Sequence, residues 1–133
     1  MFIDSAFGAA IAVRLRALGF NNVFEVNFGG ASPDPHYLNM RAYMWNQQKE
    51  WLMRGLIPPK DDDLEMDLTG PGFHINGSGK LVLESKQDMQ KRGIGSPDDG
   101  DALALTFAQP VAPRKPQPYQ PAPVASEPRG WMR

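Results

Sequence analysis

The sequence predicts an α/β domain over residues 1–109, followed by an unstructured tail over residues 110–133. Two observations favour this fold class. Segments rich in β-favouring residues alternate with segments whose apolar residues have helical spacing. The chain has 133 residues, of which 41% are hydrophobic and 22% charged, a composition typical of globular proteins. This length accommodates one domain with one hydrophobic core.

A strand, a helix and a second strand are predicted at the N-terminal end. Met-Phe-Ile predicts a short strand with Asp4 at its tip, and the next segment predicts a helix that ends at Gly19. Residues 21–30 hold a near-continuous run of β-favouring side chains bounded by Asn and Gly, which predicts the second strand. This order is typical of a parallel crossover. The helix has a broad apolar face formed by Ile11, Val13, Leu15 and Leu18.

The middle of the chain predicts a long helix followed by a hairpin. Residues 37–55 have apolar side chains on one wide face, with Gly55 after the end of the helix. These side chains, Trp45 among them, are expected to face the core rather than to stack on nucleic-acid bases. A short helical turn is predicted at residues 61–68, and two strands are predicted around the turn at residues 76–79.

Two further helices are predicted before the tail. Residues 86–92 predict a short helix that ends at Gly93. Residues 96–109 predict a helix with Ser96 at its cap and Pro97 in its first turn. The tail holds seven of the 13 prolines and offers little to bury.

Composition limits the possible functions. The chain has no cysteine and two histidines, so any bound metal is expected to have oxygen ligands. Residues 1–109 carry 10 basic and 14 acidic side chains, and residues 110–133 carry 4 and 1. Bulk electrostatics therefore disfavours DNA binding by the body, and a DNA contact would need a local patch, the tail or a metal. No segment predicts a membrane span or a signal peptide, which favours a cytoplasmic protein.

Carboxylates gather where an α/β sheet commonly places its functional site. Asp4 lies at a predicted strand tip, while Asp98, Asp99 and Asp101 lie at a predicted helix start. Such carboxylates can hold Mg²⁺ or Mn²⁺, and two ions ~3.5–4 Å apart can drive phosphodiester hydrolysis. The alternative is that these aspartates serve only as helix caps and partners of the helix dipole.

Three basic residues lie between the predicted hairpin and this acidic helix. They are Lys86, Lys91 and Arg92. They form either a small basic patch beside the acids or an ordinary solvated helix face.

Several motifs, taken in order, resemble one family. The chain contains N-x-R-A-x-M-W, then L-E-S-K-x-D-M-x-K-R-G, then S-P-D-x-x-D-A-L-A-L-T-F-A. With the segments MFIDSAFGAAIAVRLRALGF and FEVNFGGAS before them, they closely resemble the C-terminal part of the nuclease domain of tailed-phage terminase large subunits. The resemblance covers residues 1–108. It departs from the family at Tyr43, where the family often has an acid.

The resemblance implies a partial ribonuclease H-like fold and a metal-dependent endonuclease, a hydrolase that cuts double-stranded DNA during DNA packaging. Asp4 corresponds to the acid on the fourth core strand and Asp98 to the acid at the start of the last core helix. Asp101 follows one helical turn later and is expected to face the same site. Asp98 is expected to be the direct metal ligand and Asp101 its support, although the reverse assignment stays open. Direct metal binding by Asp99 also stays open. Lys86 is expected to contact DNA or orient an acid, with Lys91 and Arg92 as further DNA contacts. The implied cofactor is Mg²⁺ or Mn²⁺.

Two features of the family are not found in this sequence. The strand with the first catalytic aspartate is not found, and neither is a G-x-x-x-x-G-K-[ST] motif for the ATPase motor. The chain is therefore expected to act with the remaining large-subunit polypeptide, and the small subunit and the portal are further candidate partners, in the host cytoplasm during phage assembly. Without the earlier strands, the sheet is expected to expose an edge and an apolar face.

Two other functions remain open at this stage. The chain is alternatively a non-catalytic fragment that serves as an interaction module of the packaging complex, with its Pro-rich tail binding the portal, DNA or another protein. It is otherwise a complete small α/β domain unrelated to nucleases, with its aspartates acting as caps.

Overall fold

A computed structural model describes residues 1–57 and 59–111 of the chain, so the predicted tail lies almost entirely outside the described residues. The N-terminal unit, residues 1–26, contains β1 (Phe2–Asp4), α1 (Ser5–Ala17) and β2 (Phe24–Val26). The two strands pair in parallel, with Phe2 opposite Phe24, which confirms the predicted crossover. Gly19 follows α1 with a φ of +90°, a left-handed conformation that favours glycine.

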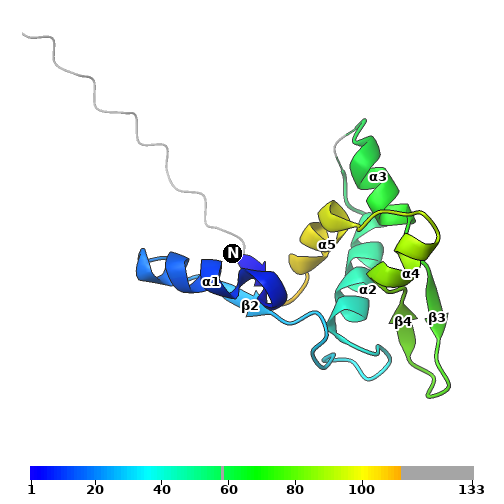
Figure 1. The fold of residues 1–133 in the computed structure, drawn as a ribbon, viewed down its shortest axis with the longest axis horizontal. Helices are drawn as coiled ribbons and strands as arrows, with labels where there is room; N and C mark the ends of the chain where they lie inside the picture. Colours follow the sequence, from blue (N-terminus) through cyan, green and yellow to red (C-terminus); the bar gives the residue numbers. More distant parts are fainter. Residues whose placement is uncertain (58, 112–133) are drawn as a thin grey trace, which may run out of the picture.

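The remaining elements form a helical body over residues 37–108. In chain order they are α2 (Met40–Leu52), α3 (Asp62–Thr69), β3 (Phe73–Ile75), β4 (Leu81–Leu83), α4 (Lys86–Lys91) and α5 (Asp98–Leu105). Figure 1 shows the N-terminal unit to one side of this body. Helix α2 packs against both α5 and β4, and α5 also contacts α3 and β1. All the predicted helices and strands of this region are present, and β3 and β4 form the predicted antiparallel hairpin.

Side-chain caps explain where three of these helices begin. Asn39 accepts a hydrogen bond from the Ala42 N–H at the start of α2, at 3.0 Å. Asp61 caps α3 and Ser85 caps α4 in the same way. Each cap satisfies a backbone N–H that the first helical turn would otherwise leave unpaired.

The start of α5 differs from the prediction. Pro97 occupies the position before the first helical residue, and α5 has no side-chain cap of its own. The hydroxyl of Ser96 turns instead to the carboxylate of Asp98, at 2.6 Å. The predicted Ser96 cap is therefore wrong, because Pro97 takes the cap position and the Ser96 hydroxyl donates to Asp98.

A small core joins the two parts of the structure. Its buried members are Val26, Met44, Trp45 and Ala104. They come from β2, α2 and α5, and partly buried residues such as Phe2 pack around them. The apolar face predicted over residues 37–55 is only partly buried. Trp51 and Met53, at its C-terminal end, are exposed. Among the described residues, no helix is long and apolar enough to cross a lipid bilayer.

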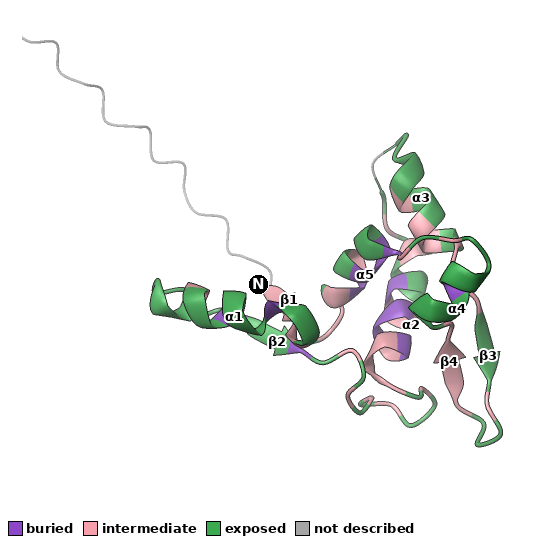
Figure 2. Ribbon diagram, viewed as in Figure 1, coloured by how far each residue is buried: buried purple, intermediate pink, exposed green. Residues whose placement is uncertain are grey.

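Helix α1 leaves most of its predicted apolar face uncovered. Only Gly8 and Ala12 of this helix are buried, and Figure 2 shows α1 as largely exposed. Phe7, Ile11 and Leu18 are all exposed, Phe7 at 92%. Their spacing places them on one side of the helix, which we call the α1 stripe. Within the described residues, β1 pairs only with β2, so the structure agrees with the expected exposed edge and apolar face.

We predict that the α1 stripe makes the chain self-associate. Replacing Phe7 and Ile11 together by Gln should shift the protein toward the monomer, because it removes apolar surface that association would bury. Sedimentation velocity over a range of protein concentrations measures this shift. Leu56→Gln is the matched control, since Leu56 is also 92% exposed but lies outside the stripe. A wild-type chain that remains monomeric at every concentration would contradict the prediction.

Candidate functional site

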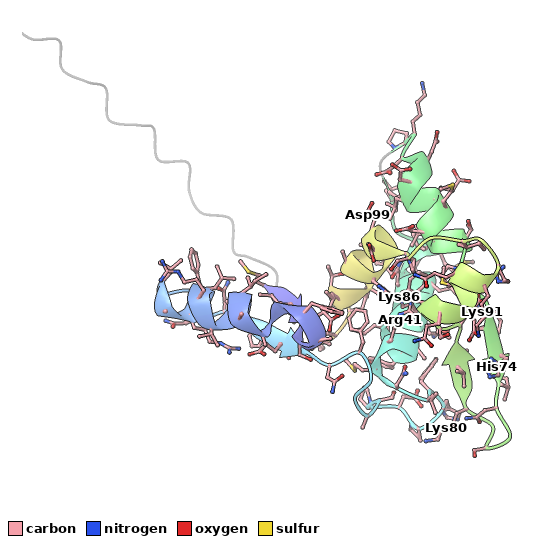
Figure 3. All side chains as sticks on the ribbon, viewed as in Figure 1. Arg41, His74, Lys80, Lys86, Lys91 and Asp99 are labelled. Carbon is pink, nitrogen blue, oxygen red and sulfur yellow. The ribbon has the colours of Figure 1, made fainter. Side chains whose placement is uncertain are left out.

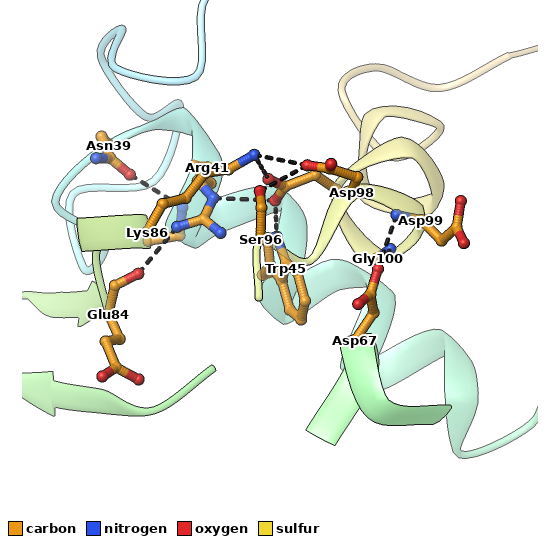
Figure 4. Close-up of polar contacts among 12 residues, drawn as sticks. Asn39, Arg41, Trp45, Asp67, Glu84, Lys86, Ser96, Asp98, Asp99 and Gly100 are labelled. Atoms are coloured by element: carbon orange, nitrogen blue, oxygen red, sulfur yellow. Dashed lines mark hydrogen bonds and ion pairs between the residues drawn. The ribbon is translucent and has the colours of Figure 1, made fainter. Parts of the chain in front are cut away.

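A cluster of charged side chains lies where the starts of α2, α4 and α5 meet. We call it the α5 cluster, and Figure 4 shows its contacts. Its members are Arg41, Trp45, Lys86, Asp98 and Asp101. The structure therefore brings together three residues that the sequence singled out, Lys86, Asp98 and Asp101, and adds two from α2.

Asp101 is the buried centre of the α5 cluster, with 5% of its surface exposed. Its Oδ1 accepts hydrogen bonds from Arg41 Nε at 2.9 Å and from Trp45 Nε1 at 2.8 Å. Its Oδ2 lies 3.0 Å from Lys86 Nζ as an ion pair, but this oxygen receives no well-directed hydrogen bond from the described residues. Two cations and an indole N–H thus compensate the buried carboxylate.

Asp98 lies beside Asp101 but faces solvent, with 79% of its side chain exposed. Its Oδ1 accepts hydrogen bonds from Ser96 Oγ at 2.6 Å and Lys86 Nζ at 3.2 Å. The Ser96 hydroxyl, followed by the Lys86 ammonium, lowers the pKa of Asp98, because both stabilise the carboxylate. Asp98 is therefore an ionised carboxylate open to solvent, held on one side by Ser96 and Lys86.

Lys86 connects the two acids. Burial lowers the pKa of Lys86, but the contacts with Asp101 and Asp98 outweigh this effect and the net shift is upward. The ammonium group therefore stays charged and balances part of the negative charge of the pair. Lys86 is the first residue of α4, so its position follows from the Ser85 cap.

Arg41 ties α2 to the end of the hairpin. Besides its bond to Asp101, its Nη1 donates to the backbone oxygen of Glu84 at 2.9 Å. The guanidinium also lies 5.8 Å from the centre of the Trp45 ring, within the range of a cation–π contact. Arg41 thereby fixes the position of Asp101 relative to β4.

Helix α3 holds the start of α5 in place. Asp67 Oδ2 accepts hydrogen bonds from the backbone N–H groups of Asp99 at 2.8 Å and Gly100 at 3.2 Å. This carboxylate replaces the side-chain cap that α5 lacks. In Figure 4 the carboxylate of Asp99 points away from Lys86 and Asp98. Asp99 thus contributes its backbone N–H to the contact with α3.

The other predicted site residues lie outside the α5 cluster. Lys91 pairs with Asp88 at 2.7 Å, and Arg92 Nε donates to Glu84 at 2.8 Å. Figure 3 shows Lys91 projecting from α4 near the hairpin, apart from Arg41 and Lys86. The structure therefore brings only Lys86 of the three predicted basic residues to the acids.

Asp4 has a different environment from Asp98 and Asp101. Its carboxylate accepts a hydrogen bond from the Ala6 N–H at 3.0 Å and caps α1. In the part of the chain that the structure describes, no group of three or more His, Cys, Asp or Glu side chains is disposed to hold a metal ion. The structure thus does not gather Asp4, Asp98 and Asp101 into one such group.

Sequence reasoning missed the roles of Arg41, Trp45 and Asp67. It placed Trp45 in the core, which is correct for the ring, but did not foresee the bond from its indole N–H to Asp101. The available signal was the spacing of Arg41 and Trp45, which are four residues apart and lie on one helix face. Nothing in the sequence pattern indicated Asp67, because its contacts join residues more than thirty positions apart.

No protein-family model and no curated protein sequence matches the chain. Solved structures do match, and those described below are nuclease domains of a phage terminase large subunit. The nuclease domain of the large terminase subunit gp2 of bacterial virus Sf6 aligns with a TM-score of 0.63 and 21% identity, over 83% of this chain and 65% of that domain.

Two structures of one point mutant of the Sf6 nuclease domain give similar alignments. One, solved with calcium, has a TM-score of 0.64 and 21% identity, over 82% of this chain and 64% of the other. The other, solved with manganese, has a TM-score of 0.62 and 20% identity, over 82% of this chain and 65% of the other. The chain therefore shares the fold of this nuclease domain, as its motifs predicted, and spans about two thirds of the length of the domains it matches.

We predict that Gly100 is required for the close contact between α5 and α2. A Cβ at this position would lie 2.9 Å from the ring of Trp45, which is buried and bound to Asp101. Gly100→Ala should therefore lower the free energy of unfolding by roughly 1–2 kcal/mol, even after the gain of about 1 kcal/mol in helix propensity. Chemical denaturation measures the change. Gly95→Ala is the control, since a Cβ there would meet nothing within 4 Å. Equal effects of the two substitutions would contradict the prediction.

We also predict that Ser96 keeps Asp98 ionised at low pH. Because the folded-state pKa of Asp98 is lowered, its contribution to stability is complete above the pKa of an unfolded aspartate and is lost as the pH falls through the lower folded value. Ser96→Ala should raise the titration midpoint of the Asp98 carboxyl in a carbon-detected NMR titration. Lys91→Ala should leave that midpoint unchanged, since Lys91 pairs with Asp88. An unchanged midpoint in Ser96→Ala would refute this assignment.

Proposed function

We propose that this chain forms part of a metal-dependent endonuclease of a phage terminase large subunit, which cuts double-stranded DNA during genome packaging. The observation that carries the proposal is the solvent-exposed carboxylate of Asp98, held by Ser96 and Lys86 beside the buried Asp101. The shared fold with the Sf6 terminase nuclease domain supports the same function. The proposal extends beyond the fold, because fold alone does not determine activity.

The donor atoms of the α5 cluster suit a hard divalent cation. Mg²⁺ and Mn²⁺ prefer carboxylate oxygens, and Asp98 is exposed while Asp101 Oδ2 lacks a well-directed hydrogen bond. The Sf6 domain has been solved with calcium and with manganese. A bound Mg²⁺ or Mn²⁺ would supply Lewis-acid activation of a phosphodiester and of water. Asp98 would hold it directly, with Asp101 as the supporting acid and with Asp4 or a further polypeptide contributing additional carboxylates.

The residues of the α5 cluster take distinct roles in this proposal. Asp98 is the direct metal ligand, because its carboxylate is ionised and open to solvent. Asp101 supports it by fixing Lys86, and Arg41 and Trp45 fix Asp101 in turn. The Lys86 ammonium balances the acids while no cation is bound, and it is the group nearest to them that can contact a DNA phosphate.

The proposed activity requires partners. Double-stranded DNA is the substrate, and additional large-subunit polypeptide, or a further copy of this chain, covers the α1 stripe and completes the ligand set, in the host cytoplasm during phage assembly. The small subunit and the portal are further candidates. The α1 stripe also supports the second function, a non-catalytic interaction module of the packaging complex, because exposed apolar surface of this kind favours protein contacts.

We predict that Asp98→Ala abolishes metal-dependent cleavage without unfolding the chain. The measurement is nicking of supercoiled plasmid by the purified protein with Mn²⁺, with Mg²⁺ or with EDTA. Asp99→Ala is the matched control, since it removes the same charge from the same helix turn but its carboxylate points away from Lys86. Circular dichroism of both variants establishes that they are folded.

The outcomes separate the two functions. Nicking by wild type and by Asp99→Ala, but not by Asp98→Ala, supports the nuclease role. Equal nicking by all three proteins would exclude Asp98 as a ligand. No nicking by a folded wild-type chain would favour the interaction module, or a site that further polypeptide must complete.

A further inference from the structure

An open groove lies where the last described residues run beside α2. It has a volume of about 340 Å³ and is lined by Tyr43 and Gln47 of α2 together with residues 106, 107 and 109–111. Tyr43 and Gln47 are four positions apart and therefore share one helix face. We call this site the Tyr43 groove. The described part of the chain ends in its wall, at Val111.

Aromatic rings form much of the surface at the Tyr43 groove. The ring centre of Phe107, in its wall, lies 5.8 Å from that of Trp51. The ring of Tyr43 lies edge-on to that of Tyr37, also with 5.8 Å between centres, and we call these two the tyrosine pair. Both tyrosines are only half-buried. Grooves lined by aromatic rings are the surfaces that proline-rich segments in the polyproline II conformation recognise.

The chain that leaves the groove has prolines at the spacing of this conformation. Pro110, Pro113 and Pro116 recur every three residues. Polyproline II has three residues per turn and rises ~3.1 Å per residue, so these prolines share one edge at intervals of about 9 Å. Pro110 already lines the groove. A continuation of the chain in this conformation therefore directs Pro113 and Pro116 to the side that Pro110 faces.

The charges of the two parts of the chain are complementary. Residues 110–133 carry three more basic than acidic side chains, whereas residues 1–109 carry four more acidic than basic ones. Two of the basic side chains, Arg114 and Lys115, lie between the second and third prolines of the series. The basic charge of the tail is thus placed within the segment that the proline spacing selects.

Two acids of the body lie beside the tyrosine pair. Burial, followed by the charges of Asp34 and Glu50, raises the pKa of Tyr37, so both carboxylates are near its hydroxyl. Glu50 is exposed, and it lies seven positions after Tyr43, on the same face of α2. The surface next to the Tyr43 groove therefore offers negative charge to a basic segment.

We propose that residues 112–116 of this chain bind the Tyr43 groove in the polyproline II conformation. Pro113 and Pro116 pack against the tyrosine pair, and the basic residues between them lie toward the two acids. The occupant is the chain's own segment because it is tethered to the groove wall at Val111, which gives it an effective concentration on the order of millimolar. The proposal is independent of the nuclease function, since no member of the α5 cluster lines the groove.

The test is paramagnetic relaxation enhancement in the full chain labelled with nitrogen-15. Gln117→Cys carries a nitroxide, and the label is unique because the chain has no other cysteine. We expect strong enhancement at the backbone N–H groups of Tyr37 and Tyr43 and at the side-chain NH₂ of Gln47. Unlabelled body signals that keep their positions establish that the chain is folded.

Proline substitutions separate docking from mere proximity. Replacing Pro113 and Pro116 together by Gly should lower the enhancement at least about twofold, because glycine lacks the fixed φ that preorganises the segment. Replacing Pro121 and Pro123 by Gly is the matched control and should leave the enhancement unchanged. Replacing the two basic residues of the segment by Gln should also lower it, since their attraction to the acids is lost.

Two results would overturn the proposal. Equal enhancement before and after the Pro113 and Pro116 substitutions would show a tail that is only near its attachment point. Enhancement in a mixture of nitroxide-labelled nitrogen-14 chain and unlabelled nitrogen-15 chain would show that a second copy supplies the segment. Neither result bears on the plasmid-nicking experiment, so the two proposals fail independently.

Discussion

The buried carboxylate of Asp101 is the constraint on which the rest of the structure depends. It receives Arg41 and Trp45 from α2 and Lys86 from α4, so one side chain of α5 fixes three elements relative to one another. Removing one partner of a buried, paired charge typically destabilises a protein by about 3–5 kcal/mol, because the remaining charge stays uncompensated. The same contacts that hold α5 in place therefore also set the position and charge of Lys86 beside Asp98.

This arrangement requires close backbone packing as well as charge. Trp45 can donate to Asp101 only because α5 approaches α2 at Gly100, where a side chain would meet the indole ring. Asp67 supports the same approach from α3 by accepting the first backbone N–H groups of α5. The exposed Asp98 is thus mounted on a helix start that three other helices hold, which is the rigidity a ligand-binding carboxylate needs.

The sequence predicted the elements well and the contacts between them less well. Local signals, such as the Gly19 and Gly93 helix ends and the turn in the hairpin, were sufficient because each acts within a few residues. The Ser96 cap was wrong because α5 begins one residue later than expected, with Pro97 in the cap position, and the position of the first helical residue is set by the folded geometry. The roles of Arg41 and Asp67 depend on residues 60 and 32 positions away, which no local pattern encodes. The spacing in α1 indicated an apolar face, but it could not show which of its side chains would stay exposed.

The α5 cluster and the α1 stripe differ in whether this chain itself supplies their partners. The charges of the α5 cluster are compensated by side chains of this chain, whereas the α1 stripe has no covering element among the described residues. Ile11 and Leu18 are already partly covered, so burying the rest of Phe7, Ile11 and Leu18 would contribute roughly 3–6 kcal/mol, at about 1.5–3 kcal/mol for each fully exposed side chain. That amount is comparable to the lower end of the stability of a typical domain, about 5–15 kcal/mol. A polypeptide that covers the α1 stripe would therefore enlarge the core and stabilise the N-terminal unit that carries Asp4.

Because α5 packs against β1 of that unit, covering the stripe would also restrict the position of Asp4 relative to Asp98. If the proposed function holds, assembly with such a polypeptide and completion of the acidic site are thermodynamically coupled.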